Sequence, residues 1–282
     1  MLGESDRRTF LKLGGATGAA ALLNTGMAGR VEAFAQFAQN LDSQLGNNPA
    51  DVVSDSGVVL NSSFLMYHEM SYPKLKSDIL SLIRRGQQPI SPDTAVNVLN
   101  GVTEIPPGLQ TFMVTCDDSL ASQYDSVLRA TEEIANETGW FVPVTFCAIT
   151  KLDDPTIPIE ELPDNTPMYN DGRHRYLTLG QVINLIQAGH ILANHTVDHA
   201  VLPNLPDGAR NAEVEVAEQR INTIYDIAQV ARPAKIIAYP LGRYTGELSY
   251  IDQLGFDLGL STIPTTRHTT QTRLYAGRIK MS

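Results

Sequence analysis

Residues 111–149 read TFMVTCDDSLASQYDSVLRATEEIANETGWFVPVTFCAI. An apolar run at 111–116 meets two aspartates, a helical stretch follows at 121–139, and a second apolar run occupies 141–149. Two short apolar runs joined by a helix are typical of a βαβ unit, whose two strands are parallel. This unit predicts an α/β fold.

The same alternation continues on both sides of this unit. Further strands are expected at 63–68, 190–194, 235–240 and 257–262, and further helices at 75–86, 178–188, 208–231 and 246–255. The tail is expected to form a last strand or an edge segment. The order predicts a parallel sheet with helical crossovers, as a barrel or as a doubly wound sheet. The Pro/Asp-rich stretch 151–176 is expected to be a lid or binding loop, or else a plain surface excursion.

Composition narrows the class of protein. The 282 residues are 43% hydrophobic, which is enough for a sizeable core in one or two domains, and the net charge is -10. A nucleic-acid-binding protein would usually carry a basic patch, so we expect no nucleic-acid partner. The two cysteines, Cys116 and Cys147, lie in expected strands and are predicted to be buried free thiols.

The N-terminus has the pattern of an export signal. Arg7 and Arg8 precede a Gly/Ala-rich apolar run, and residues 33–35 (Ala-Phe-Ala) fit a small-x-small cleavage site. We expect a twin-arginine signal peptide at 1–35, a polar leader at 36–57 and a folded domain at 58–282. The run is too short for a stable membrane span. The expected destination is the periplasm, the cell wall or the extracellular space; an uncleaved anchor or a chance arginine pair is the alternative.

Polar residues follow several of the expected strands. Parallel α/β folds place their chemistry at the carboxyl ends of the strands, where His68, Asp117, Asp118, His195 and Tyr239 all fall. These residues are therefore expected to share one site.

A metal site is one interpretation of this group. In ILANHTVDHAVL (191–202), His195 and His199 are separated by three residues and can reach one ion from a single turn. Zinc-type catalytic sites need about three protein ligands, and Asp118 would supply the third while Asp117 accepts a proton. Each pattern alone is more often structural: a histidine pair on the surface, or an aspartate pair in a solvated turn.

The combined motifs resemble a known family. TFMVTCDDS (111–119) resembles the TFDDG motif of the polysaccharide deacetylases, the NodB-homology proteins of carbohydrate esterase family 4. NHTVDHAVL (194–202) resembles their H-S/T-x-x-H motif, and AYPLGRY (238–244) resembles their third motif. The resemblance covers residues 60–280. It implies a distorted (β/α) barrel with about seven parallel strands and a deacetylase catalytic domain at 58–282.

The resemblance also implies a reaction. The expected activity is metal-dependent removal of acetyl groups from an N-acetylated or O-acetylated polysaccharide. The implied metal ligands are Asp118, His195 and His199, with zinc foremost and cobalt, nickel, manganese or iron possible. Asp117 would be the base. Roles in substrate or oxyanion binding fall to Thr196, in the Ser/Thr place of the motif, to Tyr239 on the sugar groove, and to the backbone N–H of Leu241.

Several positions depart from the family pattern. Cys116 and Ser119 stand where Phe and Gly are usual, and Ala238 stands where many members have an arginine that holds the catalytic aspartate. The usual C-terminal histidine motif is absent.

The segment FLMYHEM (64–70) resembles the poly-N-acetylglucosamine deacetylase branch, in which the acid histidine comes from the first strand. His68 is therefore the expected general acid. His268 is the fallback, although a solvated loop position is expected for it. His174 and His190 are expected to be structural or surface residues.

Two other functions stay open at this point. The chain could be a carbohydrate-binding pseudoenzyme, or a metal-dependent hydrolase of small non-peptide C–N bonds. The intact residues Asp117, Asp118, His195 and His199 favour the deacetylase. Peptidoglycan, poly-N-acetylglucosamine, chitin and acetylated xylan are all possible polymers.

Overall fold

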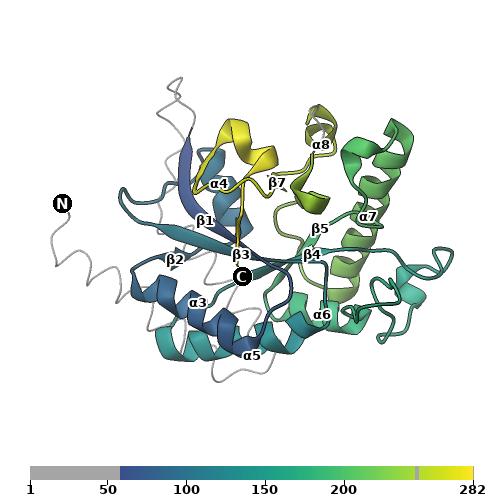
Figure 1. Cartoon of the computed structure of the whole chain (residues 1–282), viewed down its shortest axis with the longest axis horizontal. Helices are drawn as coiled ribbons and strands as arrows, with labels where there is room; N and C mark the ends of the chain where they lie inside the picture. The colour runs from purple at the N-terminus through teal and green to yellow at the C-terminus, as the bar shows by residue number, and fades with distance from the viewer. Residues whose placement is uncertain (1–57, 245–247, 282) are drawn as a thin grey trace.

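The computed structural model describes residues 58–244 and 248–281. The expected signal peptide (1–35) and polar leader (36–57) lie outside the described residues. The described chain forms one curled sheet with helices packed around it (Figure 1). Its strands are β1 (Val59–Tyr67), β2 (Gln88–Pro89), β3 (Thr111–Asp117), β4 (Val144–Ala148), β5 (Ile191–Asn194), β6 (Ile236–Ala238), β7 (Leu258–Leu260), β8 (Arg267–Thr269) and β9 (Ile279–Lys280).

The sheet is mostly parallel. Its strand order is β7-β6-β5-β4-β3-β1-β8, in which only the last pairing, β1 with β8, is antiparallel. The short strands β2 and β9 pair in parallel with β3 and β1. Because the helical crossovers join parallel strands, every strand from β3 to β7 ends at the same rim of the sheet.

The C-terminal segment joins the two sides of the sheet. Ala276 forms a parallel bridge with Leu260 of β7, and β9 then pairs with Leu65 and Met66 of β1. The sheet therefore curls into a distorted barrel rather than a doubly wound sheet. The predicted fold is confirmed, with six strands on the continuous parallel path β7-β6-β5-β4-β3-β1 and two short parallel strands beside it.

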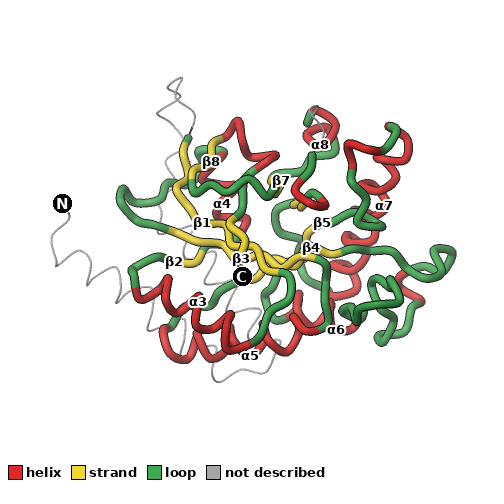
Figure 2. Tube along the Cα trace, in the orientation of Figure 1, coloured by secondary structure: helices red, strands yellow, loops and turns green. Residues whose placement is uncertain are grey.

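Helices cover the outside of the curled sheet (Figure 2). They are α3 (Tyr72–Arg84), α4 (Pro92–Leu99), α5 (Ser122–Thr138), α6 (Leu179–Gln187), α7 (Asp207–Ala228) and α8 (Ser249–Gln253). α3 packs on α5, and α6 packs on α7. Thr178 caps α6 through a reciprocal bond pair with Gln181, and Gly139 ends α5 at a φ of 77°.

The short elements α4, β2 and β8 were not predicted from the sequence. α4 is short, and Ser91 caps it by accepting a hydrogen bond from the Thr94 N–H. β8 is a three-residue strand whose only partner on the main path is β1. Elements this short carry too few residues to show a hydrophobic period.

β3 shows how the sheet divides the core. Every residue of the strand is buried, so both of its faces are covered. Phe112, Val114 and Cys116 belong to the larger apolar cluster, which includes residues of the covering helices α3 and α5. The alternate positions Thr115 and Asp117 face the other side, because side chains of a strand alternate. β3 therefore carries two polar residues into the barrel interior.

Candidate metal centre and active site

The rim formed by the carboxyl ends of the strands collects the expected site residues. Asp117 ends β3, His195 follows β5, and His68 follows β1. The side chain of Gln123, on α5, donates hydrogen bonds to the backbone oxygens of Asp117 (2.6 Å) and His68 (2.9 Å). This buried amide ties the ends of two neighbouring parallel strands together.

Three potential metal ligands meet beside this point. The Oδ1 atom of Asp118 lies 3.5 Å from the Nε2 atoms of both His195 and His199. One donor atom from each residue lies within 4.8 Å of the other two. The side chain of His195 is 2% exposed, whereas those of Asp118 and His199 are 25% and 29% exposed. The cluster therefore opens to solvent on the side of Asp118 and His199.

The orientation of His195 suits a metal ligand. Its Nδ1 lies 2.7 Å from the backbone oxygen of Ala238, and a carbonyl can only accept, so Nδ1 carries the proton. In the neutral imidazole Nε2 is then the nitrogen without a proton, and it lies 3.5 Å from Asp118 Oδ1. Histidines that bind metals are commonly held by such a bond from the other ring nitrogen.

Asp118 supplies a second indication. Its Oδ1 is buried and has no hydrogen-bond partner among the described residues. An unsatisfied buried carboxylate oxygen is costly, and a cation between this oxygen and the two imidazoles would satisfy it. Two nitrogens and one oxygen are also a donor set that zinc accepts in catalytic sites. The residues present therefore fit a divalent metal ion.

Asp117 is held by an arginine that the sequence analysis did not identify. Arg278 places its two terminal nitrogens 2.6 Å and 2.8 Å from the two carboxylate oxygens of Asp117. Both side chains are almost completely buried. Burial by itself raises the pKa of Asp117, but the charge and hydrogen bonds of Arg278 outweigh it and hold this pKa well below its usual range.

Arg278 comes from the segment that closes the barrel. It follows the Ala276 bridge and immediately precedes β9, so its side chain enters the barrel interior. The Nε atom donates to the Ser261 oxygen (3.1 Å), and one terminal nitrogen also contacts the Thr115 hydroxyl (3.1 Å). Ala238 stands where the resemblance implies an arginine, and in this chain Arg278 holds Asp117 instead.

Unusual backbone conformations gather at this rim. Six described residues other than glycine have a positive φ, and five of them lie on the loops that follow β3, β5 and β6: Asp118, Ser119, Thr196, His199 and Leu241. Each such residue costs of order 1–3 kcal/mol, and such strain is concentrated at functional sites. Ser119, with a φ of 55°, adopts the conformation that the family glycine would allow.

His68 lies near the cluster. It directly follows β1, which runs parallel to β3, and Gln123 donates to the backbone oxygens of both His68 and Asp117, so His68 lies at the same rim. The residue is half-buried, and Gln123 holds its backbone oxygen. The fallback candidate His268 lies elsewhere: it pairs with Leu60 near the other end of β1. It is fully buried and stacks on Phe64, so both its expected solvated position and its fallback role are wrong.

Of the three residues expected to contact substrate, two are buried and one is exposed. Tyr239 is 1% exposed, and its hydroxyl donates to the Leu274 oxygen at 2.7 Å, so the prediction that its side chain lines a sugar groove is wrong. Thr196 is buried, and its hydroxyl accepts the Ala200 N–H at 3.2 Å. The Thr196 hydroxyl thus stabilises the loop that carries His195 and His199, and it does not point towards a ligand. Leu241 is 61% exposed on the loop after β6, and its oxyanion role stays a prediction.

The stretch 151–176 borders the site at both ends. Lys151 forms an ion pair of 2.7 Å with Asp198, which is the residue before His199. At the far end Tyr176 bridges Leu120, two residues after Asp118. Tyr169 packs edge-to-face on Tyr176 at a ring separation of 4.7 Å and is only half-buried. Tyr169 is thereby connected through Tyr176 to the segment that follows Asp118.

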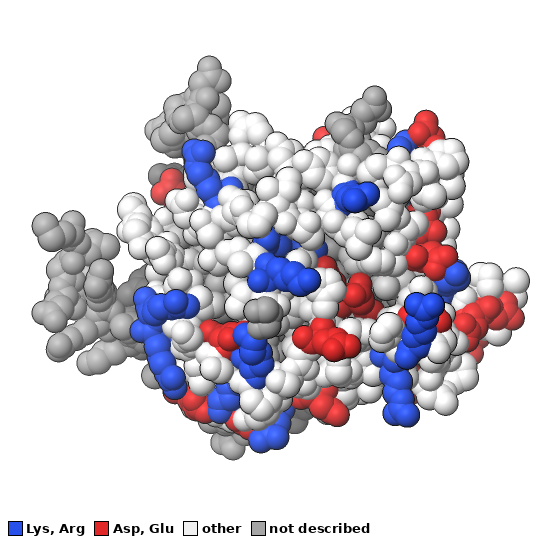
Figure 3. All heavy atoms as spheres, viewed as in Figure 1, with Lys and Arg blue, Asp and Glu red and all other residues white. Residues whose placement is uncertain are grey.

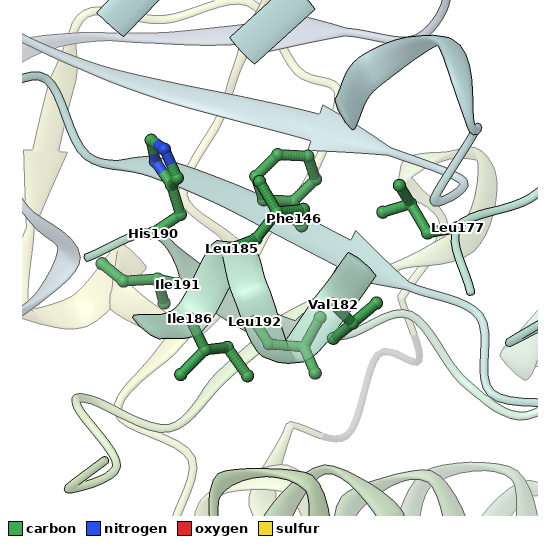
Figure 4. A pocket seen from close by; sticks show the side chains of 8 residues that line it. All are labelled: Phe146, Leu177, Val182, Leu185, Ile186, His190, Ile191 and Leu192. Atoms are coloured by element: carbon green, nitrogen blue, oxygen red, sulfur yellow. The ribbon is translucent and has the colours of Figure 1, made fainter. Parts of the chain in front are cut away.

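The remaining histidines and the two cysteines have the surface or buried structural positions that the sequence predicted. His174 is exposed and pairs with Asp171, while Cys116 and Cys147 are buried free thiols. His190 is buried against an apolar gap between β4, α6 and β5 that leaves no room for a water molecule (Figure 4). This gap is part of the core and is no substrate site. Burial lowers the pKa of His190 to about 3.

The surface shows mixed charge. Lysine and arginine side chains are interspersed with aspartate and glutamate on the face seen in Figure 3. Within the described part of the chain, none of the helices has the length and apolar character needed to span a bilayer.

Two family descriptions match the chain. The sequence model of the polysaccharide deacetylase family matches residues 107–259, more than half of the 282 residues. That region contains Asp117, Asp118, His195 and His199. A second model, for the twin-arginine translocation pathway signal sequence, matches residues 4–23.

Individual relatives are more distant. YxkH of Bacillus subtilis (strain 168), a candidate polysaccharide deacetylase, is 26% identical over 112 residues, which are 39% of this chain and 38% of that protein. The chain thus spans well under half the length of this curated relative.

Solved structures extend the likeness to most of the chain. The Streptococcus pyogenes deacetylase PplD, in complex with acetate, matches with a TM-score of 0.62 and 20% identity, over 80% of this chain and 93% of that one. IcaB from Ammonifex degensii matches with a TM-score of 0.60 and 16% identity, over 79% and 92%. At these identities the structures show a shared fold.

Proposed function

The chain belongs to the polysaccharide deacetylase family, and we propose that it removes acetyl groups from an N-acetylated or O-acetylated polysaccharide with the help of one divalent metal ion. The observation that carries this proposal is the convergence of Asp118, His195 and His199 beside an aspartate held by a buried arginine. Acetate, which is bound to the Streptococcus pyogenes relative, is the product that such a reaction releases.

Asp118, His195 and His199 would hold the metal. When bound there, a zinc-type ion lowers the pKa of water to about 7 and polarises the acetyl carbonyl. Zinc is the first candidate because two imidazoles and a carboxylate are common zinc ligands. Cobalt, nickel, manganese and iron also accept this donor set.

Asp117 would be the general base. The carboxylate is ionised at neutral pH and can accept a proton from the attacking water, although its lowered pKa makes it a weaker base than an ordinary aspartate. Arg278 occupies one site on each oxygen, and a carboxylate has about four acceptor sites in total. The carboxylate can therefore still accept a hydrogen bond from that water, while Arg278 fixes the orientation of the carboxylate plane.

His68 would be the general acid. An amine is a poor leaving group unless it is protonated, so an amide substrate needs a proton donor at the nitrogen. His68 is half-buried at the same rim and directly follows β1, the strand next to β3, and this position supports a role as proton donor to a group bound at the metal centre. This role also agrees with the resemblance of residues 64–70 to the poly-N-acetylglucosamine deacetylase branch.

Substrate would lie along the open side of the cluster. The backbone N–H of Leu241 is the proposed oxyanion donor, since Leu241 is an exposed residue of the short 3-10 helix Pro240–Gly242 that follows β6. The half-buried ring of Tyr169 offers a face to a sugar ring. The twin-arginine signal indicates export, so we place the reaction at a polymer outside the cytoplasm, in the periplasm, the cell wall or the extracellular space.

Acetate release across a set of polymers tests the proposal. Chelated protein and protein reloaded with one equivalent of Zn²⁺ would be incubated with chitooligosaccharides, poly-N-acetylglucosamine, peptidoglycan and acetylated xylan. We expect release from at least one polymer that depends on reloading. Binding of polymers without any release would support a pseudoenzyme, and turnover confined to a panel of small amides would support a hydrolase of small C–N bonds; either result refutes the proposed function.

A further inference from the structure

The loop that carries both histidines has an unfavourable backbone. It begins after β5, and two of its residues, Thr196 and His199, have φ values of 68° and 53°. These left-handed turns bring the ring of His199 back to within 4.8 Å of the ring of His195. A strained conformation persists only where surrounding contacts enforce it, so the loop needs partners that hold its backbone.

Helix α7 provides such a partner in Glu213. One carboxylate oxygen of Glu213 accepts the backbone N–H groups of Val197 (3.0 Å) and Asp198 (2.9 Å). The Val197 N–H is shared with the Glu213 backbone oxygen (3.1 Å), whereas the Asp198 N–H bonds to the carboxylate alone. These two residues lie between Thr196 and His199, so the carboxylate fixes the middle of the turn. Hydrogen bonds from backbone N–H groups to a charged carboxylate are among the stronger ones in proteins.

The start of the loop is held by the same helix. The side chain of Asn194 donates to the Val214 oxygen (3.0 Å) and to the Glu218 carboxylate (3.3 Å), and its own oxygen accepts the Thr196 N–H (2.9 Å). The loop is thus attached to α7 at its start and at its middle. Of the two acidic attachments, only Glu213 contacts the backbone between the histidines.

We propose that Glu213 is a positioning residue of the metal centre, whose carboxylate fixes the turn that aligns His199 with His195 and Asp118. This inference rests on the proposed function, because it assumes that the three residues bind a metal ion. Glu213 itself contacts neither the ligands' side chains nor the reacting atoms in this arrangement. Substituting Glu213 should therefore lower metal affinity directly, and any loss of turnover should follow from the loss of metal.

The test measures metal affinity in four variants. Chelated protein would be titrated with Zn²⁺ by calorimetry, with competition by a chelator if binding is tight. Glu213→Ala should weaken binding about 10- to 100-fold, the range typical of residues that orient metal ligands. Glu213→Gln should retain most of the affinity because its amide oxygen can still accept both N–H groups. Glu213→Asp should lose affinity, because the shorter side chain withdraws the oxygen.

Glu215→Ala is the matched control. Glu215 lies on the same helix, is half-buried like Glu213, and accepts a hydrogen bond from Tyr250 (2.8 Å) instead of contacting the loop. This variant should bind Zn²⁺ within about twofold of the wild type. Thermal unfolding of the metal-free variants would show whether Glu213→Ala folds; if it does not, the Gln and Asp variants decide the question.

Two results would overturn the inference. The first is unchanged Zn²⁺ affinity in a folded Glu213→Ala or Glu213→Asp variant. The second is strong loss in Glu213→Gln with retention in Glu213→Asp, which would mean that only the charge of the carboxylate matters. Failure of the wild type to bind any Zn²⁺ would instead refute the proposed function and this inference together, so the two failures are distinguishable.

Discussion

Arg278 donates two hydrogen bonds to the carboxylate of Asp117, a residue 161 positions earlier in the chain. The pair joins the last segment of the barrel to the strand that carries the proposed base. Both charges are buried away from water, so each one is stabilised by the other. The relationship links the closure of the barrel to the geometry of the active site.

The first prediction concerns this pair. Arg278→Met should lower the free energy of unfolding by about 3–5 kcal/mol, because it leaves the Asp117 carboxylate buried without a counter-charge. The double variant Asp117→Leu/Arg278→Met should be clearly more stable than Arg278→Met, since it buries no unpaired charge. Urea unfolding measures both. Equal stability of the single and the double variant would show that the pair is not coupled.

The second prediction isolates the proton acceptor. Asp117→Asn should reduce acetate release about 10²- to 10⁴-fold, since an amide cannot take the proton from water. Metal content should stay near one ion per chain, because Asp117 is not among the three clustered ligands. The assay is run at a temperature where the variant remains folded. Near-normal acetate release would refute the assignment of the base.

The third prediction tests His68 with two leaving groups. His68→Gln should reduce hydrolysis of an N-acetyl sugar strongly, by about 10²-fold or more, because the amine must be protonated as it leaves. Hydrolysis of p-nitrophenyl acetate should fall much less, since its leaving group needs no acid. Comparing kcat for both substrates measures the difference. Equal losses on the amide and the ester would exclude an acid role.

A fourth prediction follows from the buried His190. Its pKa is lowered to about 3 by burial, while an unfolded histidine has a pKa near 6.5. As pH falls below about 6.5 the unfolded state binds a proton that the folded state does not, so the folded state loses stability. The loss should be about 1.4 kcal/mol per pH unit from this residue, and it should continue until pH approaches 3.

The comparison variant for this effect is His190→Gln, which has no group that titrates in this range. The side-chain oxygen of glutamine can still accept the Val144 N–H that His190 Nδ1 accepts at 3.3 Å. Relative to this variant, the wild type should lose stability progressively between pH 6.5 and pH 5 in urea unfolding. Parallel stability curves across that range would contradict a neutral buried His190.

Much of the fold could be predicted because its pattern is local. Alternating apolar runs and helical periods identified the parallel strands β1 and β3 to β7, and the strand-end rule brought Asp118 and His195 to one rim. The spacing of His195 and His199 also suggested a shared ion. These inferences depend on residues close in sequence or on a general property of parallel sheets.

The parts that could not be predicted depend on contacts between distant segments. Nothing near Arg278 in the sequence indicates that it pairs with Asp117, because the pairing arises only when the C-terminal segment closes the barrel. His268 looked solvated in its polar neighbourhood, yet pairing of β8 with β1 buries it. Tyr239 follows a strand at the correct rim, but its ring turns into the core instead of the groove.

The backbone of the site was also hidden from the sequence. Ser119 and His199 adopt left-handed conformations without glycine, and only the surrounding contacts explain them. The Leu177 N–H donates to the Ser119 oxygen at 2.7 Å, and Glu213 holds the residues before His199. Such enforcement is a tertiary effect that local propensity does not report.

Removal and return of the metal test the central claim most directly. Purified wild type would be stripped with a chelator and titrated with Zn²⁺ while bound metal and acetate release are both measured, with His195→Ala treated in parallel. We predict that activity disappears on stripping and returns at one equivalent per chain, and that His195→Ala neither retains the ion nor recovers activity. Full activity in the stripped protein, or one tightly bound ion in His195→Ala, would contradict a catalytic metal held by Asp118, His195 and His199.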